Sequence, residues 1–147
     1  MQSTLISFKH TDLGQINSVQ AFLRSLFRVR AKIKNAKLLF RGQASAASRL
    51  LPTVGRKHKY GGRSKFFSPD DETQLLYRFR RRAYPHERRV LKAGEALFLA
   101  RHYGLPTRLL DWTANALFGL YFASVERPTI SGALWAIRPT ERKQPLD

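Results

Sequence analysis

The stretch Leu99–Phe122 constrains the fold of this chain more than any other, because a helix stop comes directly before the most apolar run of the sequence. Gly104 favours the left-handed conformation that commonly follows the end of a helix, and Pro106 prevents that helix from continuing. The next residues, Thr107–Asp111, form a short β-like run. The sequence therefore predicts a helix end, a sharp turn and a short buried strand.

A second helix is expected after this strand, since no charged residue occurs between Ala114 and Ser124. Thr113 can cap this helix by accepting a hydrogen bond from a free backbone N–H. A helix that is apolar all round is expected to be buried on more than one side, and this one is too short to cross a bilayer, which takes about 20 apolar residues. Polar side chains beside such a buried segment need a hydrogen-bond or ion-pair partner in the protein or in a ligand. The residues concerned are His102, Arg108, Asp111 and Asn115.

The charge balance of the chain is strongly basic. Its 147 residues include 27 Lys and Arg against 10 Asp and Glu, a net charge of +17. Such a charge favours a polyanionic partner, such as a nucleic acid, although a basic protein without that partner, or a fragment lacking an acidic half, would show the same number. The absence of cysteine excludes disulfides and thiolate zinc sites. No basic-then-apolar leader opens the sequence, so we expect a cytoplasmic protein without a membrane partner.

The periodicity of the rest of the chain predicts one α+β domain, with about four helices packed on a small mixed sheet. Ser18 caps the first helix, and Ser68 with Pro69 opens the second, which Pro85 ends. Besides Ala114–Ala123, the expected helices are Val19–Ala31, Pro69–Ala83 and Lys92–Tyr103. The expected strands are Leu5–Phe8, Lys37–Phe40, Thr107–Asp111 and Gly132–Ile137. We place a strand and helix extension at 1–36, the main domain at 37–137 and a tail, expected to be truncated, at 138–147.

Arg41 and Gly42, at the end of an expected strand, indicate a binding site for an anionic ligand. Glycine lets a ligand or another backbone approach closely, and the planar fork of arginine suits phosphate or carboxylate. A structural role, in which Arg41 pairs with a buried Asp111, explains the same pattern. The candidate ligand-binding residues are Arg41, Gly42, Gln43, Arg56, Arg108, Thr113 and Asn115.

Three residues are candidates for catalysis: His102, Asp111 and Glu72. A neutral histidine near pH 7 suits proton transfer, and Glu95, two turns earlier on the same helix stripe, could orient His102. Glu72 shares a helix face with apolar residues, which is unusual for a carboxylate. The structural alternatives are that Glu72 only interacts with the dipole of the first helical turn, or that it forms a buried ion pair with Arg108. We expect no metal site, because three or four converging ligands are required.

Two basic segments are candidates for a nucleic-acid surface. One is the segment Lys57–Lys65, which we expect to be a mobile loop because it mixes four Lys and Arg residues and one histidine with two glycines. The other is the exposed face of the helix that begins at Pro69. The residues proposed for phosphate contacts are Lys57, Lys59, Arg78, Arg81 and Arg82, and the alternative is a merely solvated charged surface.

The order of the motifs resembles the FRG domain, a family named for its Phe-Arg-Gly signature whose activity is poorly defined. The resemblance runs from about Lys37 to Ile137, and its motifs are Phe40-Arg41-Gly42-Gln43, Pro52-Thr53-Val54-Gly55-Arg56, Glu72 with Phe79, and the run His102-Tyr103-Gly104-Leu105-Pro106-Thr107-Arg108-Leu109-Leu110-Asp111-Trp112-Thr113. The chain departs from the family pattern at Arg101, where Gln is usual, and at Ala116, where Pro is usual.

A looser resemblance links the chain to ADP-ribosyltransferase folds. These folds place an arginine at the end of an early strand, near the phosphates of NAD, and a short Ser- or Thr-bearing strand before a buried helix. Arg41 and the segment Leu110–Thr113 match these two elements. The catalytic glutamate of such folds has no clear counterpart, because neither Glu126 nor Glu141 lies in an expected strand.

The sequence therefore leaves three functions open. The first is the binding of a nucleic acid or nucleotide through a cleft containing Arg41, His102, Arg108 and Asp111. The second is NAD-dependent ADP-ribosyl transfer, for which NAD would be the cofactor. The third is a structural or interaction domain without catalysis. The oligomeric state is not indicated.

Overall fold

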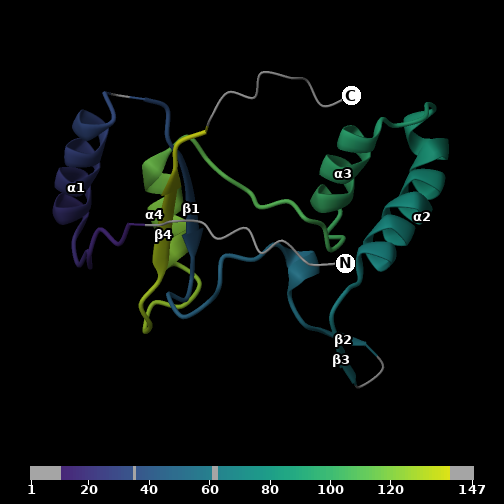
Figure 1. Ribbon diagram of the computed structural model, residues 1–147, viewed down its shortest axis with the longest axis horizontal. Helices are drawn as coiled ribbons and strands as arrows, with labels where there is room; N and C mark the ends of the chain where they lie inside the picture. The colour runs from purple at the N-terminus through teal and green to yellow at the C-terminus, as the bar shows by residue number, and fades with distance from the viewer. Residues whose placement is uncertain (1–10, 35, 61–62, 140–147) are drawn as a thin grey trace. The chain divides into compact units, whose positions relative to one another are not determined.

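The computed structural model describes residues 11–34, 36–60 and 63–139, and within them the fold is α+β (Figure 1). The described elements are helices α1 (Val19–Lys32), α2 (Pro69–Glu87), α3 (Ala93–His102) and α4 (Ala116–Ser124), a 3₁₀ turn η1 (Thr53–Gly55), and strands β1 (Leu39–Gln43), β2 (His58–Tyr60), β3 (Arg63–Lys65) and β4 (Ala133–Ile137). No helix in these ranges is long and apolar enough to span a bilayer.

Helix α1 belongs to one compact unit of the chain, and Leu39–Ile137 forms the other. Ser18 caps α1 by accepting from the N–H of Ala21 at 3.2 Å, as its sequence predicts. Phe22 is the buried residue of this helix. The predicted strand Leu5–Phe8 and most of the predicted tail, residues 140–147, lie outside the described residues.

The second unit contains a two-stranded ribbon, in which β1 pairs antiparallel with β4 so that Arg41 lies opposite Trp135. Successive side chains of a strand point to opposite faces. Phe40 and Gly42 therefore face α4, and Phe40 is only 2% exposed. Arg41 projects from the other face of β1. The strand predicted at Lys37–Phe40 thus exists, but it begins two residues later and extends through the Arg-Gly-Gln sequence.

Helices α2 and α3 pack against each other through an apolar cluster that includes Ala83, Leu91 and Ala96. Ser68 and Asp71 form a reciprocal capping box at the start of α2, which confirms the predicted helix start. The prediction that Pro85 ends this helix is wrong, because α2 continues to Glu87. Pro85 lies in the last exposed turn, where a backbone carbonyl left without its helical partner can bind water.

The strand predicted at Thr107–Asp111 does not form, and the predicted mixed sheet is wrong because both described sheets are antiparallel pairs. Side chains and a neighbouring turn use the backbone groups of this segment. The N–H of Arg108 donates to Glu72, and the carbonyl of Thr107 accepts from the N–H of Val54. Pairing with β1 is limited to one bridge between Phe40 and Thr113.

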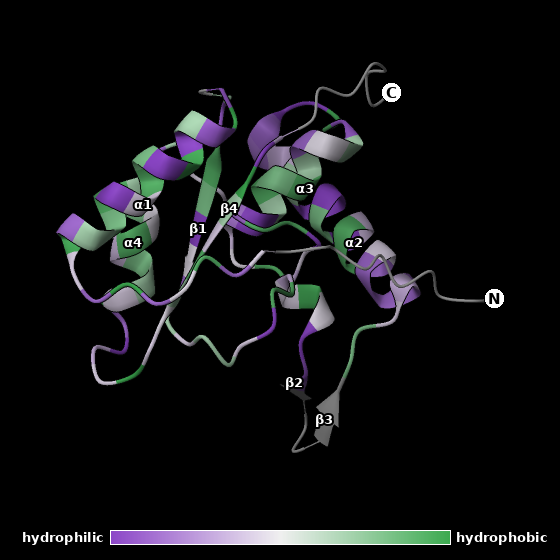
Figure 2. Cartoon of the chain, turned by 60° about the vertical axis from the view of Figure 1, so that its left-hand side comes forward, coloured by the Kyte–Doolittle hydropathy of each residue, from purple (hydrophilic) through white to green (hydrophobic). Residues whose placement is uncertain are grey.

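Helix α4 lies against β1 with only one face. Its small residues Ala116, Gly119 and Ala123 are buried, whereas four large side chains are about half exposed: Leu117, Phe118, Tyr121 and Phe122. Where α4 can be seen in Figure 2, its ribbon is white to green. The prediction that α4 is buried on more than one side is therefore wrong, because apolar composition alone does not indicate how many neighbours a helix has.

The basic segment predicted as a mobile loop contains a short antiparallel hairpin. His58 pairs with Lys65 where β2 meets β3. The Nε2 atom of His58 lies 2.7 Å from the carbonyl oxygen of Thr53, and the ring of His58 packs edge-on against Phe67. These contacts attach the base of the hairpin to neighbouring residues of the same unit.

Candidate functional site

A cleft of about 540 Å³ opens beside β1, a volume typical of small-ligand sites. The C-terminal half of β1, the segment Asp111–Thr113 and the end of α4 all contribute to its walls. The lining residues are Phe40, Arg41, Gly42, Gln43, Ala44, Ser45, Ser48, Arg56, Asp111, Trp112, Thr113, Phe122, Glu126 and Arg127. Six of the sequence-predicted site residues are among them: Arg41, Gly42, Gln43, Arg56, Asp111 and Thr113.

Arg41 is the most buried cation of the cleft, with a side chain only 15% exposed. Its Nη1 donates to the backbone carbonyl of Asp111 at 2.8 Å, while the nearest carboxylate oxygen of Asp111 is 3.9 Å away. Its Nε is buried without a hydrogen-bond partner. Burial lowers the pKa of Arg41, against the opposing effect of Asp111. The guanidinium is thus only partly satisfied by the protein.

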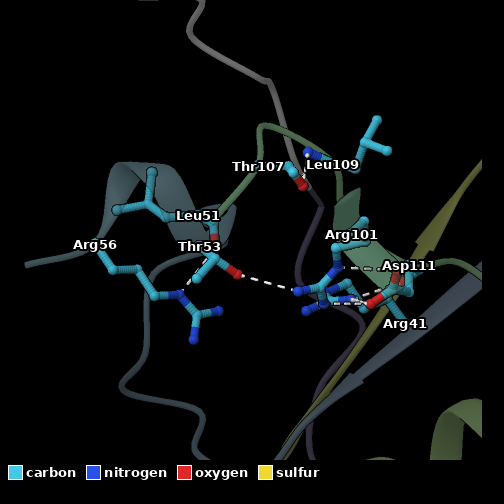
Figure 3. Close-up of polar contacts among 8 residues, drawn as sticks. All are labelled: Arg41, Leu51, Thr53, Arg56, Arg101, Thr107, Leu109 and Asp111. Carbon is cyan, nitrogen blue, oxygen red and sulfur yellow. Dashed lines mark hydrogen bonds and ion pairs between the residues drawn. The ribbon is translucent and has the colours of Figure 1, made fainter. Parts of the chain in front are cut away.

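Arg101 holds the carboxylate of Asp111. Its Nη2 lies 2.5 Å from Oδ2 of Asp111, its Nε donates to Oδ1 at 3.3 Å, and its Nη1 donates to the hydroxyl of Thr53 at 3.3 Å (Figure 3). The hydrogen bond from Arg101 lowers the pKa of Asp111. The predicted ion pair between Arg41 and Asp111 is present only as a contact of 3.9 Å, and Arg101 lies closer to the carboxylate. The expectation that Asp111 is buried is wrong, because its side chain is 64% exposed.

Gln43 supports the cleft. It is 7% exposed, its side-chain oxygen accepts from the indole N–H of Trp135 at 2.5 Å, and its amide donates to the carbonyl of Arg49 at 3.3 Å. These bonds attach the loop after β1 to the ribbon. The polar atoms of the Gln43 side chain are thus bonded within the protein, and they fix this wall of the cleft.

Arg56 supplies a second cation at the rim. Its Nε donates to the carbonyl of Leu51 at 3.1 Å (Figure 3), which orients the guanidinium. The positive charge of Arg56 contributes to lowering the pKa of Arg41, so the two guanidinium groups repel each other across the cleft. An anion bound between them would remove that repulsion.

Arg108 and Glu72 form a separate ion pair that does not line the cleft. Glu72 accepts from the backbone N–H of Arg108 at 3.1 Å, from Nε at 3.0 Å and from Nη2 at 2.7 Å. The Glu72 side chain is 10% exposed and that of Arg108 is 64% exposed. The pair alternative raised by the sequence is thus confirmed, and it ties α2 to the segment after α3.

His102 is exposed at the end of α3, and its described contact is an edge-on packing with the Tyr103 ring. The prediction that Glu95 orients His102 is wrong, because Glu95 pairs with Arg89 at 2.8 Å and also accepts from the N–H of Lys92. The expected meeting of His102 and Arg108 with Arg41 in one cleft does not occur. Catalytic roles for His102, Asp111 and Glu72 stay predictions.

Of the two predicted ligand-binding residues at the start of α4, Thr113 lines the cleft and Asn115 does not. Asn115 caps α4 by accepting from the N–H of Leu117 at 2.9 Å, so the prediction that Thr113 is the cap is wrong. The Thr113 hydroxyl accepts from the N–H of Asn115 at 3.1 Å. Its backbone exchanges two hydrogen bonds with Phe40, of 2.7 and 2.8 Å, which bring the cleft wall against β1.

The family model of the FRG domain matches residues 36–130. This chain belongs to the FRG domain family. No curated protein and no solved structure matched the chain.

The structure assigns different positions to the three signature residues of the FRG domain. Phe40 is in the core, Arg41 is in the cleft, and Gly42 packs against α4. A Cβ atom on Gly42 would overlap the carbonyl oxygen of Gly119 and lie 2.5 Å from the backbone nitrogen of Ala123. The sequence left open whether Gly42 allows a ligand or another part of the backbone to come close. The structure shows the backbone of α4 at this position.

Arg101, which binds the carboxylate of Asp111, was not among the site residues predicted from the sequence. Its only signal was the departure from the glutamine usual in the family. Glu126 and Arg127 were also not identified as site residues, since they follow α4 outside any motif, yet both line the cleft. Among the described residues, no group of three or more His, Cys, Asp or Glu side chains is placed to hold a metal ion.

The basic residues predicted as a nucleic-acid surface lie on α2 and near the β2–β3 hairpin of the FRG domain. Arg78, Arg81 and Arg82 are exposed on α2. Lys57 is exposed, and its ammonium group lies 5.6 Å from the centre of the Phe66 ring. Lys59 is in β2, and its side chain lies outside the described part of the structure.

Proposed function

We propose that the cleft beside β1 binds a nucleotide, with a phosphate group on Arg41. The observation that carries this proposal is the partly satisfied guanidinium of Arg41, whose Nε is buried without a partner. A buried polar group without a hydrogen bond costs free energy. A phosphate can accept two parallel hydrogen bonds from one guanidinium, so it would satisfy the atom that the protein leaves unpaired.

The balance of charges around the cleft also supports an anionic ligand. Three arginines line it, Arg41, Arg56 and Arg127, against the carboxylates of Asp111 and Glu126. The charge of Asp111 is already matched by Arg101, which does not line the cleft. The cations facing the cleft are therefore in excess, and this excess attracts phosphate.

Aromatic side chains in the lining support a ligand with a planar base. Trp112, which follows Asp111 in the chain, and Phe122, near the end of α4, both line the cleft. Aromatic rings gain roughly 0.5–1.5 kcal/mol from stacking beyond the area that they bury. Cations for a phosphate together with rings for a base indicate a nucleotide more than an isolated phosphate or a carboxylic acid.

Calorimetric titration with ADP, adenosine and pyrophosphate tests the proposal. ADP should bind most tightly, and Arg41→Gln should weaken ADP binding by about tenfold or more, since a hydrogen bond to a charged group contributes about 1.5–3 kcal/mol. The matched control is Arg28→Gln, which removes the same charge from an exposed site on α1. Absence of ADP binding at millimolar concentration, or an equal loss in both variants, would refute the proposal.

A second candidate function is ADP-ribosyl transfer from NAD, the alternative that the sequence raised. It is supported by the position of Glu126 in the cleft lining, because the sequence offered no carboxylate for the catalytic role in such enzymes. Nicotinamide release from NAD, compared between wild type and Glu126→Gln, tests this candidate. Binding of ADP without any nicotinamide release would leave the cleft a binding site and exclude the transferase.

A further inference from the structure

The outer face of α2 carries an uncompensated group of arginines. Between Thr73 and His86 this helix contains four arginines and no acidic residue. Arg78, Arg81 and Arg82 are exposed, and at separations of three and four residues they are neighbours on the helix surface. Like charges so placed destabilise a helix by a few tenths of a kcal/mol per pair, so the arrangement costs stability unless a partner supplies negative charge.

Two tyrosines share this face with the arginines. Tyr77 is 56% and Tyr84 is 54% exposed, and their separation of seven residues places them two turns apart on the same stripe. The guanidinium of Arg81, between them, lies 5.9 Å from the centre of the Tyr77 ring. The apolar residues of α2 point the other way, since Leu76, Phe79 and Ala83 pack in the cluster shared with α3.

We propose that this face of α2 (Tyr77, Arg78, Arg81, Arg82 and Tyr84) binds single-stranded nucleic acid. Arginines that track phosphates, combined with exposed aromatic rings on which bases stack, are the usual elements of such surfaces. A duplex keeps its base faces covered, so it would leave the tyrosines unused. A membrane would require a large apolar face, and the apolar face of α2 is already buried. The proposal is independent of ligand binding in the cleft.

The test is fluorescence anisotropy with a labelled 20-nucleotide oligothymidine at several salt concentrations. The variant Arg78→Gln/Arg81→Gln/Arg82→Gln is compared with Arg24→Gln/Arg28→Gln/Arg30→Gln on α1. Both variants lose three exposed arginines from a helix, so their net charges are equal. For three lost phosphate contacts, the slope of log K against log salt should fall by about 2 in the α2 variant only. Tyr84→Leu should weaken binding about fivefold or more at unchanged slope.

Three outcomes would overturn the proposal. Equal losses in the two triple variants would show that net charge alone attracts the oligonucleotide. Competition by poly-glutamate as effective as that by unlabelled oligonucleotide would show a surface for acidic polypeptides. Unchanged binding in Tyr84→Leu would remove the stacking role. If the α2 triple variant does not fold, as judged by circular dichroism, single substitutions of the same arginines should each reduce the salt slope by about 0.7.

Discussion

Gly42→Ala should destabilise this FRG domain strongly, because α4 lies directly on the backbone of β1. The added Cβ would overlap the carbonyl oxygen of Gly119 and lie 2.5 Å from the nitrogen of Ala123 and 2.8 Å from the carbonyl carbon of Phe122. All three atoms belong to the helix backbone. They cannot rotate away as a side chain can, so the helix itself must move.

The size of the effect follows from these distances. Restoring a separation near 3.5 Å requires α4 to shift by about 1 Å away from β1. The shift loosens the contacts of the almost completely buried Phe40. Inserting a methyl group into a packed core typically costs 1–3 kcal/mol, and we expect about 3 kcal/mol because the obstacle is backbone. For a chain of this length, that corresponds to a decrease in Tm of about 10 °C.

Thermal unfolding followed by circular dichroism measures this decrease. Gly94→Ala is the matched control, because a Cβ on Gly94 in α3 would meet no atom within 4 Å. In a helix that change is neutral or stabilising by up to about 1 kcal/mol. If Gly42→Ala unfolded within about 2 °C of the wild type, a loss below about 1 kcal/mol, close contact between β1 and α4 would not be the reason for this glycine.

Three other substitutions test single contacts. Glu72→Ala should lower the free energy of unfolding by about 2 kcal/mol in urea titration, since it removes the acceptor of the Arg108 N–H as well as an ion pair that is exposed on the arginine side only. An unchanged midpoint would contradict the pairing. Asn115→Ala should cost about 1 kcal/mol of stability in the same assay, and Asn115→Asp much less, if the side chain caps α4. Arg101→Gln should remove the ion pair with Asp111. Because the Asp111 side chain is 64% exposed, we expect a loss of stability below about 1 kcal/mol. The Arg101 hydrogen bond lowers the pKa of Asp111, so the stability difference between wild type and Arg101→Gln should be present above pH 3.8, the ordinary pKa of Asp. It should disappear as the pH falls through the lower pKa of Asp111 in the folded protein. A stability difference that persists in acid would show that the ion pair is not its cause.

The helices of this FRG domain were predictable because their signals are local. Ser18 and Ser68 accept from backbone N–H groups three residues later, and Gly104 has the positive φ of 79° that stops α3. Such caps depend on a few neighbouring residues. The α+β class followed from the same periodicity. Pro85 was misjudged because its effect depends on whether water can reach the last turn.

The segment Thr107–Asp111 could not be predicted correctly, because its hydrogen-bond partners are distant in the sequence. Glu72, 36 residues earlier, accepts from the N–H of Arg108, and Val54 donates to Thr107. A β-like pattern shows that a segment is extended and partly buried. It does not show whether its partner is a strand or a carboxylate on a helix.

The orientation of α3 about its own axis could have been deduced from the sequence, and it explains why His102 is exposed. Ala96 and Ala100 are 0% and 1% exposed, as expected for the small-residue face of this helix. A residue two positions after Ala100 is turned by about 200°, so His102 must face away from the core. Arg101 is turned by only about 100°, to the border of that face, from which its long side chain reaches Asp111.

Successive side chains of β1 point to opposite faces, so Phe40 and Gly42 pack against α4 while Arg41 lines the cleft proposed to bind a ligand. The variant Arg41→Met tests whether Arg41 serves ligand binding and not packing. Burial lowers the pKa of Arg41, so folding disfavours its charge, and its Nε is unpaired. Methionine would keep the apolar contacts of the side chain without this cost. We expect Arg41→Met to retain or raise the Tm of the wild type and to lose ADP binding. Arg41 would then resemble a residue kept for a ligand at the expense of stability. A decrease in Tm comparable to that of Gly42→Ala would instead make Arg41 a structural residue, held by Asp111.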